Sequence, residues 1–273
     1  MTKYAIGIDL GTTHSALSWV DLQTEGAAPE ILSIAQQSGP GAVQDFPLLP
    51  SFLYLPHASE FATGTLGLPW NVAPERITGE WARSHGALTP IRLVSSAKSW
   101  LGHAGVDRRA GILPADAPAE VERISPLAAS THYLQHLRDA WNYRHPEAPF
   151  DQQAVTVTIP ASFDPAAREL TAEAAKAAGY QGITLLEEPQ AALYSWIAGS
   201  AGDWRKQVQV GDVILVIDVG GGTSDFSLIA VTEDVGNLQL NRVAVGEHIL
   251  LGGDNMDLAL AHGVARGLAA EGK

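Results

Sequence analysis

The sequence of 273 residues contains no cysteine. Disulfide bonds and thiolate metal sites are therefore excluded. Positive charge is also scarce, because 17 Lys and Arg residues stand against 30 Asp and Glu residues and give a formal net charge of −13. No basic cluster interrupts the chain, and nucleic-acid binding depends on contacts from Lys and Arg to phosphates. We expect no nucleic-acid partner.

A long hydrophobic run is missing as well. Residues 1–20 do not form a secretory signal peptide, because Asp9 and a Gly-Thr turn interrupt their apolar stretch. No other run approaches the roughly 20 apolar residues of a transmembrane helix. We expect a cytoplasmic protein without a membrane partner. Its length is sufficient for a substantial core divided into lobes.

The segment 212–231 combines β-forming sequence with strong turn signals. Residues 213–217 are a continuous apolar run, typical of a strand that is buried on both faces, and Asp218 ends it. Three glycines at 220–222 supply backbone freedom and leave N–H groups open to an anion. After Thr223 the alternation of apolar and polar residues predicts an outgoing strand. The segment is therefore predicted to be a β-hairpin and not a P-loop.

Residues 4–20 repeat this pattern of strand, aspartate, glycine, threonine and outgoing strand. Asp9 corresponds to Asp218, and Gly11 corresponds to Gly220. One such hairpin alone is best explained as an ordinary tight turn. Two copies indicate similar half-domains, each contributing an acid and a Gly/Thr turn to a shared nucleotide-phosphate cleft.

Strands and helices alternate along the rest of the chain, which indicates an α/β architecture. Further strands are predicted at 30–34, 52–55, 154–159 and 183–186. Helices are predicted at 126–143, between the Asp164 cap and Gly179, at 190–198, and from an Asp254 cap through 268, with a short helix preceding Lys98.

His132 and His136 lie four residues apart on the helix predicted at 126–143. This spacing can bind zinc, but the glutamate of the metalloprotease motif is absent. We expect both side chains to project away from the apolar face of the helix into solvent.

Six motifs occur in the order seen in the ATPase domain of the Hsp70 chaperone family, which the chain resembles. They are IGIDLGTTHS (6–15), AKSWLG (97–102), VTIPASF (157–163), EEPQAAL (187–193), IDVGGGTSDFS (217–227) and LLGGDNMD (250–257). The resemblance excludes only segments near 56–75 and 103–124. It implies the actin-like ATPase (ribonuclease H-like) fold, an α/β fold of duplicated half-domains with mixed sheets.

The resemblance also implies a division into lobes. Lobe I is expected at 1–198, with a core subdomain at 1–37 and 126–198 and a reduced upper subdomain at 38–125 that carries an insertion at 56–75. The first half of lobe II is expected at 199–251, and its outer subdomain starts at 252–273. We expect a truncated chain with an incomplete lobe II.

The implied ligands are ATP or ADP with Mg²⁺, and K⁺ is a further candidate ion. Asp9 and Asp218 would hold Mg²⁺ through its waters. Lys98 would position the attacking water, and Glu188 and Asp225 would orient water or metal ligands. The residues implied to bind phosphate are Gly11, Thr12, Thr13, Gly220, Gly221, Gly222, Thr223, Gly252 and Gly253. On its residues alone, Lys98 is by default a solvated surface lysine, and only the resemblance assigns it a role. Plain turn residues are the alternative for both acids.

Two further family roles concern coupling. The residues matching Pro160 and Arg168 couple the nucleotide state to a peptide-binding domain, whereas on their own they are a strand-ending proline and an exposed helical arginine. The resemblance implies client peptides, J-proteins and exchange factors as partners.

The alternative class is a bacterial actin-like filament ATPase of the MreB type, which shares both phosphate hairpins. The lysine segment 97–102, and Pro160 with Arg168, favour the chaperone ATPase. A sugar kinase is disfavoured, because no sugar-binding signature is found.

Overall fold

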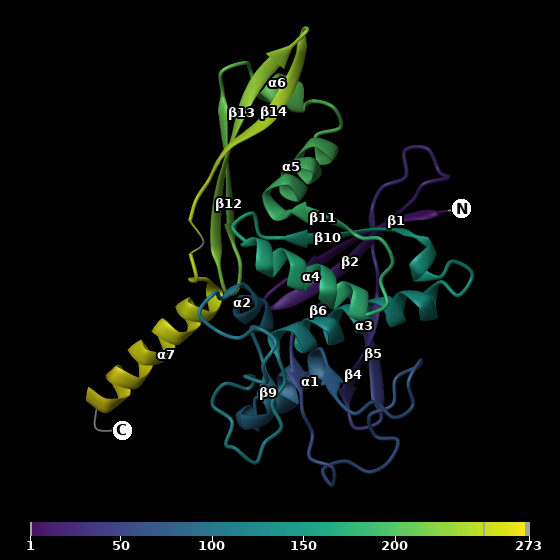
Figure 1. The fold of residues 1–273 in the computed structure, drawn as a ribbon, viewed down its shortest axis with the longest axis vertical. Helices are drawn as coiled ribbons and strands as arrows, with labels where there is room; N and C mark the ends of the chain where they lie inside the picture. The colour runs from purple at the N-terminus through teal and green to yellow at the C-terminus, as the bar shows by residue number, and fades with distance from the viewer. Residues whose placement is uncertain (1, 248, 271–273) are drawn as a thin grey trace. The chain divides into compact units, whose positions relative to one another are not determined.

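The computed structural model (Figure 1) describes residues 2–247 and 249–270. The chain divides into two compact units. Unit 1 comprises Met1–Ile159 and Asp164–Leu186, and unit 2 comprises Pro160–Phe163 and Glu187–Lys273. No helix among the described residues has the length and apolar character needed to cross a membrane.

Unit 1 is built on a mixed sheet in the order β11-β10-β1-β2-β3, and β6 also pairs with β2. β1 runs antiparallel to β2 and parallel to β10. The strands are β1 (Tyr4–Leu10), β2 (His14–Asp21), β3 (Glu30–Ile31), β6 (Leu49–Pro50), β10 (Ala154–Ile159) and β11 (Thr184–Glu187). The strands predicted at 154–159 and near 183–186 are confirmed.

Two long helices cover this sheet. α3 (Pro126–Arg144) packs against β1 and β2, and α4 (Pro165–Ala177) packs against α3 (Figure 1). The apolar stripe of α3, including Leu134, Leu137 and Trp141, is fully buried in the core. Burial of this stripe explains why the helix predicted at 126–143 forms.

The ends of α4 are fixed by local sequence. The Asp164 side chain accepts a hydrogen bond from the Ala167 N–H at 2.6 Å, and Pro165 occupies the first turn. Gly179 follows the helix with φ +88°, a left-handed conformation that favours glycine. These three sequence predictions are confirmed.

The rest of unit 1 consists of short elements. β4 (Ile34–Gly39) and β5 (Ala42–Phe46) form a hairpin, whereas β7 (Leu53–Tyr54) lies between β8 (Ile77–Thr78) and β9 (Leu93–Val94). The helices are α1 (Glu80–Gly86), the 3₁₀ turn η1 (Pro90–Arg92), α2 (Ala97–Gly102) and the 3₁₀ turn η2 (Phe150–Gln152). The single strand predicted at 30–34 is wrong, because β3 and β4 belong to different sheets.

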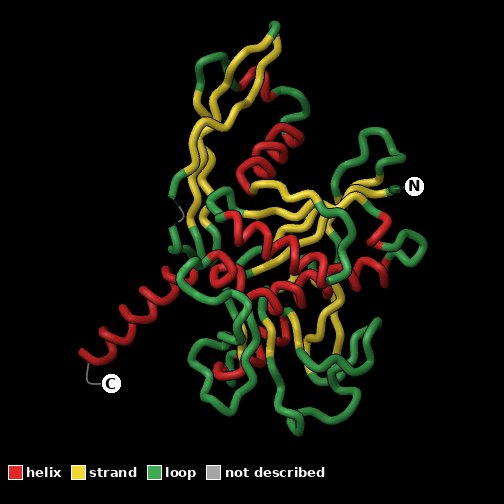
Figure 2. Tube along the Cα trace, in the orientation of Figure 1, coloured by secondary structure: helices red, strands yellow, loops and turns green. Residues whose placement is uncertain are grey.

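Unit 2 contains the antiparallel sheet β12-β13-β14, formed by Val213–Val219, Ser224–Asp234 and Asn237–Val245. Its helices are α5 (Glu188–Gly199), α6 (Trp204–Gln207) and α7 (Gly253–Ala270), drawn in red in Figure 2. The helix predicted to start at an Asp254 cap instead begins at Gly253, so Asp254 lies in its first turn.

The prediction that β12 is buried on both faces is wrong for the described chain. Val213, Leu215, Ile217 and Val219 are 52–58% exposed, whereas the side chains on the opposite face are half-buried. β12 is an edge strand, and α5 packs against it.

Candidate nucleotide-phosphate site

The two predicted hairpins have the same register. β1 and β2 end with Leu10 paired to Ser15, and β12 and β13 end with Val219 paired to Ser224. Each turn therefore spans four residues, 11–14 and 220–223. β13 starts directly after Thr223, so the hairpin interpretation is confirmed and a P-loop is excluded.

The first turn requires glycine at its start. A Cβ added to Gly11 would lie 2.0 Å from the carbonyl oxygen of His14. Ser51 braces the turn, because its hydroxyl donates to the Gly11 carbonyl at 2.8 Å and its N–H donates to the Thr13 carbonyl at 2.9 Å. The bracing role of Ser51 was missed from sequence, since Ser51 and Gly11 are 40 positions apart.

His14 lies beside this turn, where its Nδ1 is 3.3 Å from the Thr13 hydroxyl. Burial lowers the pKa of its imidazole, so the neutral form is favoured. His14 therefore adds no positive charge to the turn at neutral pH.

Asp9 lies two residues ahead of the first turn, with its side chain exposed. One carboxylate oxygen accepts a hydrogen bond from the Thr158 hydroxyl at 3.0 Å. Thr158 lies on β10, which pairs with β1. This partner was also missed, because the contact joins positions 149 apart. The hydrogen bond orients Asp9 at the end of the central strand.

The second turn is braced by the segment before α7. The Gly253 N–H donates to the Gly220 carbonyl at 3.0 Å, and the Asp254 N–H donates to the Gly221 carbonyl at 2.8 Å. A Cβ on Gly252 would lie 2.5 Å from the Gly220 carbonyl oxygen, so this close approach requires glycine. Gly252 and Gly253 thus support the turn, and their contact with phosphate stays a prediction.

Two carboxylates lie side by side on the second hairpin. Asp218 on β12 is paired directly with Asp225 on β13, which places both side chains on one face. Asp225 is 5% exposed and accepts a hydrogen bond from the Ser162 hydroxyl. Like charges directly opposite each other repel. A cation bound nearby would relieve this repulsion, so the acid pair fits a magnesium site.

The described residues contain no group of three or more His, Asp or Glu side chains placed to hold a metal directly. Binding of Mg²⁺ through water needs fewer protein ligands, because this ion keeps several waters. The pair Asp218 and Asp225 in unit 2 therefore fits an indirectly held ion.

Lys98 lies in the first turn of α2 and is half-buried. Its neighbours Ala97 and Leu101 are fully buried and anchor the short helix to the core. Ser96, directly before α2, has a left-handed backbone with φ 53°. The position of Lys98 is thus set by packing on both sides of it.

The remaining predicted residues lie at element ends or on helices. Glu188 is the first residue of α5. The preceding Glu187 forms an ion pair with Arg242. Pro160 is buried directly after β10, and Arg168 is half-buried on α4, so the alternative of an exposed helical arginine is wrong.

The structure places Asp9, the first turn and Lys98 in unit 1. It places Asp218, the second turn, Asp225 and Glu188 in unit 2. The shared cleft between them stays a prediction.

His132 and His136 are not solvated, contrary to the sequence prediction. His136 is 5% exposed, and its Nε2 donates to the Ala35 carbonyl at 2.9 Å. His132 is half-buried, with its Nε2 3.5 Å from the Arg76 guanidinium. The loop before β8 packs over this face of α3 and brings Trp70 against His136, with ring centroids 5.2 Å apart. A helix periodicity could not predict this cover, because the loop is distant in sequence.

Comparison with known families matches residues 72–271 to the family described as Hsp70 protein. The curated Chaperone protein HscA homolog of Bordetella pertussis is 30% identical over 273 residues, which cover 96% of this chain and 37% of that protein. Chaperone protein HscA of Cronobacter sakazakii is 32% identical over 276 residues, with coverages of 95% and 37%. The chain thus spans little more than a third of the length of these relatives.

Proposed function

The chain belongs to the Hsp70 family, and from this premise we propose that it is the ATP-binding part of an HscA-like chaperone with a Mg²⁺-dependent ATPase. Membership implies the actin-like ATPase fold, and the mixed α/β structure agrees with it. The lobes proposed are 1–198 and 199–273, with the subdivisions predicted from sequence.

One observation carries the proposal. The chain contains two hairpin turns of equal length, each with an aspartate two residues before its first glycine and each braced through its carbonyl groups. The Gly220 N–H donates to the Thr223 carbonyl within the second turn. Bracing through carbonyls does not consume the other turn N–H groups, which suits the binding of phosphate oxygens. Thr12, Thr13 and Thr223 add hydroxyl donors to these turns.

The acids are assigned to the metal ion and its waters, and Lys98 is assigned to the attacking water. Asp9 and Asp218 would hold Mg²⁺ through its waters, and Glu188 and Asp225 would orient further waters. Mg²⁺, when bound, supplies positive charge to the phosphates. Lys98 orients the attacking water and offsets negative charge that develops on the γ-phosphate oxygens.

The same proposal extends to the whole protein. Client peptides, J-proteins and exchange factors are its proposed partners, and Pro160 and Arg168 are its proposed coupling residues. K⁺ is a further proposed ion, and the cytoplasm is the proposed location. The relatives are chaperone proteins by name, which supports client peptides and co-chaperones in general. The other assignments follow from the sequence resemblance alone.

Lys98→Ala in the natural protein tests the assignment. We expect ATP hydrolysis to fall at least about a hundredfold while ATP binding changes little, because the lysine acts mainly on the transition state. Asp9→Asn should weaken Mg²⁺-dependent binding and hydrolysis together. Single-turnover hydrolysis and equilibrium binding measure the two effects separately.

Lys176→Ala is the matched control, since Lys176 is an exposed lysine on α4. Lys176→Ala should leave both the rate of ATP hydrolysis and the affinity for ATP unchanged. Hydrolysis at the parental rate in Lys98→Ala would show that Lys98 does not orient the attacking water.

A filament-forming ATPase is the alternative that the family match disfavours. Sedimentation at increasing protein concentration with and without ATP separates the two functions, because only a filament protein forms a pellet that depends on ATP. We expect no ATP-dependent pellet.

A further inference from the structure

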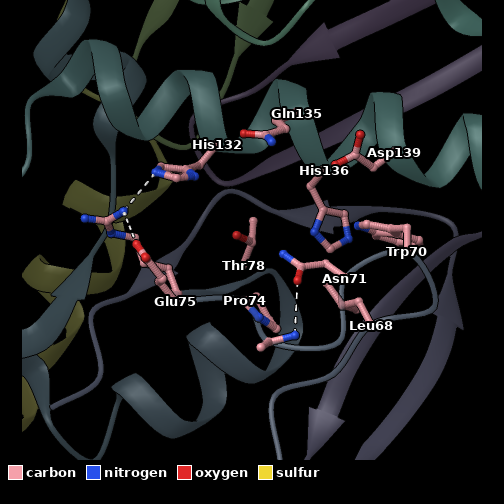
Figure 3. A pocket seen from close by; sticks show the side chains of 12 residues that line it. Leu68, Trp70, Asn71, Pro74, Glu75, Thr78, His132, Gln135, His136 and Asp139 are labelled. Carbon is pink, nitrogen blue, oxygen red and sulfur yellow. Dashed lines mark hydrogen bonds and ion pairs between the residues drawn. The ribbon is translucent and has the colours of Figure 1, made fainter. Parts of the chain in front are cut away.

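A cavity of about 320 Å³ lies in unit 1 between the loop before β8 and one face of α3 (Figure 3). The loop contributes Trp70, Glu75 and Arg76. α3 contributes His132, Gln135, His136 and Asp139, which share one face because they are spaced three and four residues apart. The volume lies near the lower end of the usual range for small-molecule pockets.

This cavity is separate from the nucleotide-phosphate site. It includes no residue of either phosphate turn and none of the acids assigned to Mg²⁺. Trp70 and Asn71 precede residue 72, where the match to the Hsp70 family begins. Part of the wall is therefore built by sequence that the family match does not include.

The positive charge at the cavity is already used by protein partners. Arg76 donates to the Glu122 carboxylate at 2.7 Å through Nη2. Its Nη1 lies 3.5 Å from His132 and 4.0 Å from the Glu75 carboxylate, as the dashed lines in Figure 3 show. An anionic ligand would have to compete with these carboxylates for the guanidinium.

Hydrogen-bond acceptors, in contrast, remain open. The His136 Nε2 donates to a carbonyl, so it carries the hydrogen and Nδ1 presents a lone pair. Burial lowers the pKa of this imidazole to about 4, which keeps the ring neutral at neutral pH. The Asp139 carboxylate accepts from Arg138 through Oδ1 alone. Within the described residues, neither the His136 Nδ1 nor the Asp139 Oδ2 has a hydrogen-bond partner.

Trp70 gives the cavity an aromatic wall. Its indole is half-buried and lies nearly perpendicular to the His136 ring, at an interplanar angle of 85°. The face of an indole attracts cations, and the Asp139 carboxylate lines the same cavity.

We propose that this cavity binds an organic cation through a primary ammonium or guanidinium group. Asp139, Gln135 and the His136 Nδ1 accept its hydrogen bonds, and Trp70 covers its alkyl stem and charge. The cation comes either from a free small molecule or from a basic side chain of a peptide.

Titration calorimetry on the 273-residue chain tests the proposal with n-butylguanidinium, n-butylammonium and the neutral analogue N-butylurea. At least one cation should bind about tenfold more tightly than the urea, because hydrogen bonds between charged groups are stronger than neutral ones. N-acetylarginine N-methylamide separates the two sources. Tighter binding of the amide than of n-butylguanidinium assigns the cavity to a peptide side chain, and the reverse assigns it to a free small-molecule cation.

Asp139→Asn keeps the shape of the side chain and should weaken cation binding about tenfold. Trp70→Leu should also weaken it, and it provides a second variant if loss of the Arg138 partner destabilises Asp139→Asn. Glu25→Gln, which removes an exposed carboxylate from a turn, is the control for net charge and should leave binding unchanged. Thermal unfolding establishes that each variant is folded.

Three results would overturn the proposal. They are the absence of cation binding at millimolar concentration, equal binding of N-butylurea, and unchanged affinity in folded Asp139→Asn and Trp70→Leu. None of these measurements involves nucleotide, so the outcome is independent of the proposed ATPase.

Discussion

Gly11 and Gly220 occupy corresponding positions in the two hairpins, but their surroundings differ. A Cβ on Gly11 would lie 2.0 Å from a backbone oxygen, whereas a Cβ on Gly220 would lie 3.6 Å from the nearest one. The first contact is a clash that a rotamer change cannot relieve, and the second is ordinary van der Waals contact. The two glycines therefore differ in their tolerance of a side chain.

We expect Gly11→Ala to lower the free energy of unfolding by about 3 kcal/mol, because the turn must open to admit the methyl group. Gly220→Ala should change it by no more than about 1 kcal/mol. Urea denaturation of both variants gives the comparison. Equal destabilisation would show that the first turn relaxes freely.

The residue scale also shows which site features are predictable. Asp9, Asp218 and the glycines could be predicted, because a turn between two strands is encoded by adjacent residues. Ser51 and Thr158 could not, because each reaches its partner only after distant strands are brought together. Local signals carry no information about such partners.

At the scale of elements, the start of α4 depends on one carboxylate with two partners. Asp164 caps the helix and forms a two-point ion pair with Arg108, with Nη1–Oδ1 and Nη2–Oδ2 distances of 3.0 and 2.7 Å. The hydrogen bonds from Arg108 lower the pKa of Asp164 from 3.8 to about 2. The ion pair also fastens the segment around Arg108 to α4.

Because the pKa of Asp164 is lowered in the folded chain, the stability that the ion pair contributes depends on pH. The stabilisation is fully present above about pH 4 and is lost as the pH falls towards 2. Because the Asp164 side chain is 39% exposed, we expect only about 1 kcal/mol after solvent screening.

Asp164→Asn should keep the cap and lose the charge. The free energy of unfolding of this variant should fall further below that of the parent chain at pH 6 than at pH 3, as measured by urea denaturation. Glu169→Gln on the same helix, at an exposed position, is the control. An equal loss of unfolding free energy at pH 3 and pH 6 would show that the ion pair does not cause the loss.

The elements themselves were largely predictable, since α3 and α4 carry both an apolar stripe and start signals. Their surroundings were not. His136 became buried because the loop containing Trp70 covers α3. β12 kept one exposed face because strand periodicity does not specify which neighbours cover it.

At the scale of the whole molecule, two apolar surfaces stand out. One is the outer face of β12, formed by Val213, Leu215, Ile217 and Val219. The other lies along α7, where Met256, Leu258, Leu260, Val264 and Leu268 are 45–69% exposed. Contiguous apolar surfaces of this kind favour association.

We expect the 273-residue chain to bind the dye ANS and to self-associate as its concentration rises. The double variant Leu215→Lys, Ile217→Lys should reduce both effects, and ANS fluorescence with sedimentation velocity measures them. Leu88→Lys is the control, because Leu88 is 81% exposed outside these surfaces. Equal effects of the double variant and the control would contradict the prediction.

Main-chain hydrogen bonds from Gly253 and Asp254 fix the start of α7 to the second turn, so a tilt of the helix would pivot at this turn. The helix has 18 residues, so it is about 27 Å long. Its first turn is tied to the backbone of Gly220 and Gly221 rather than to flexible side chains. A tilt of about 10° at the second turn would displace the C-terminal end of α7 by roughly 5 Å. A small adjustment of the turn would therefore produce a larger displacement at the far end of the helix.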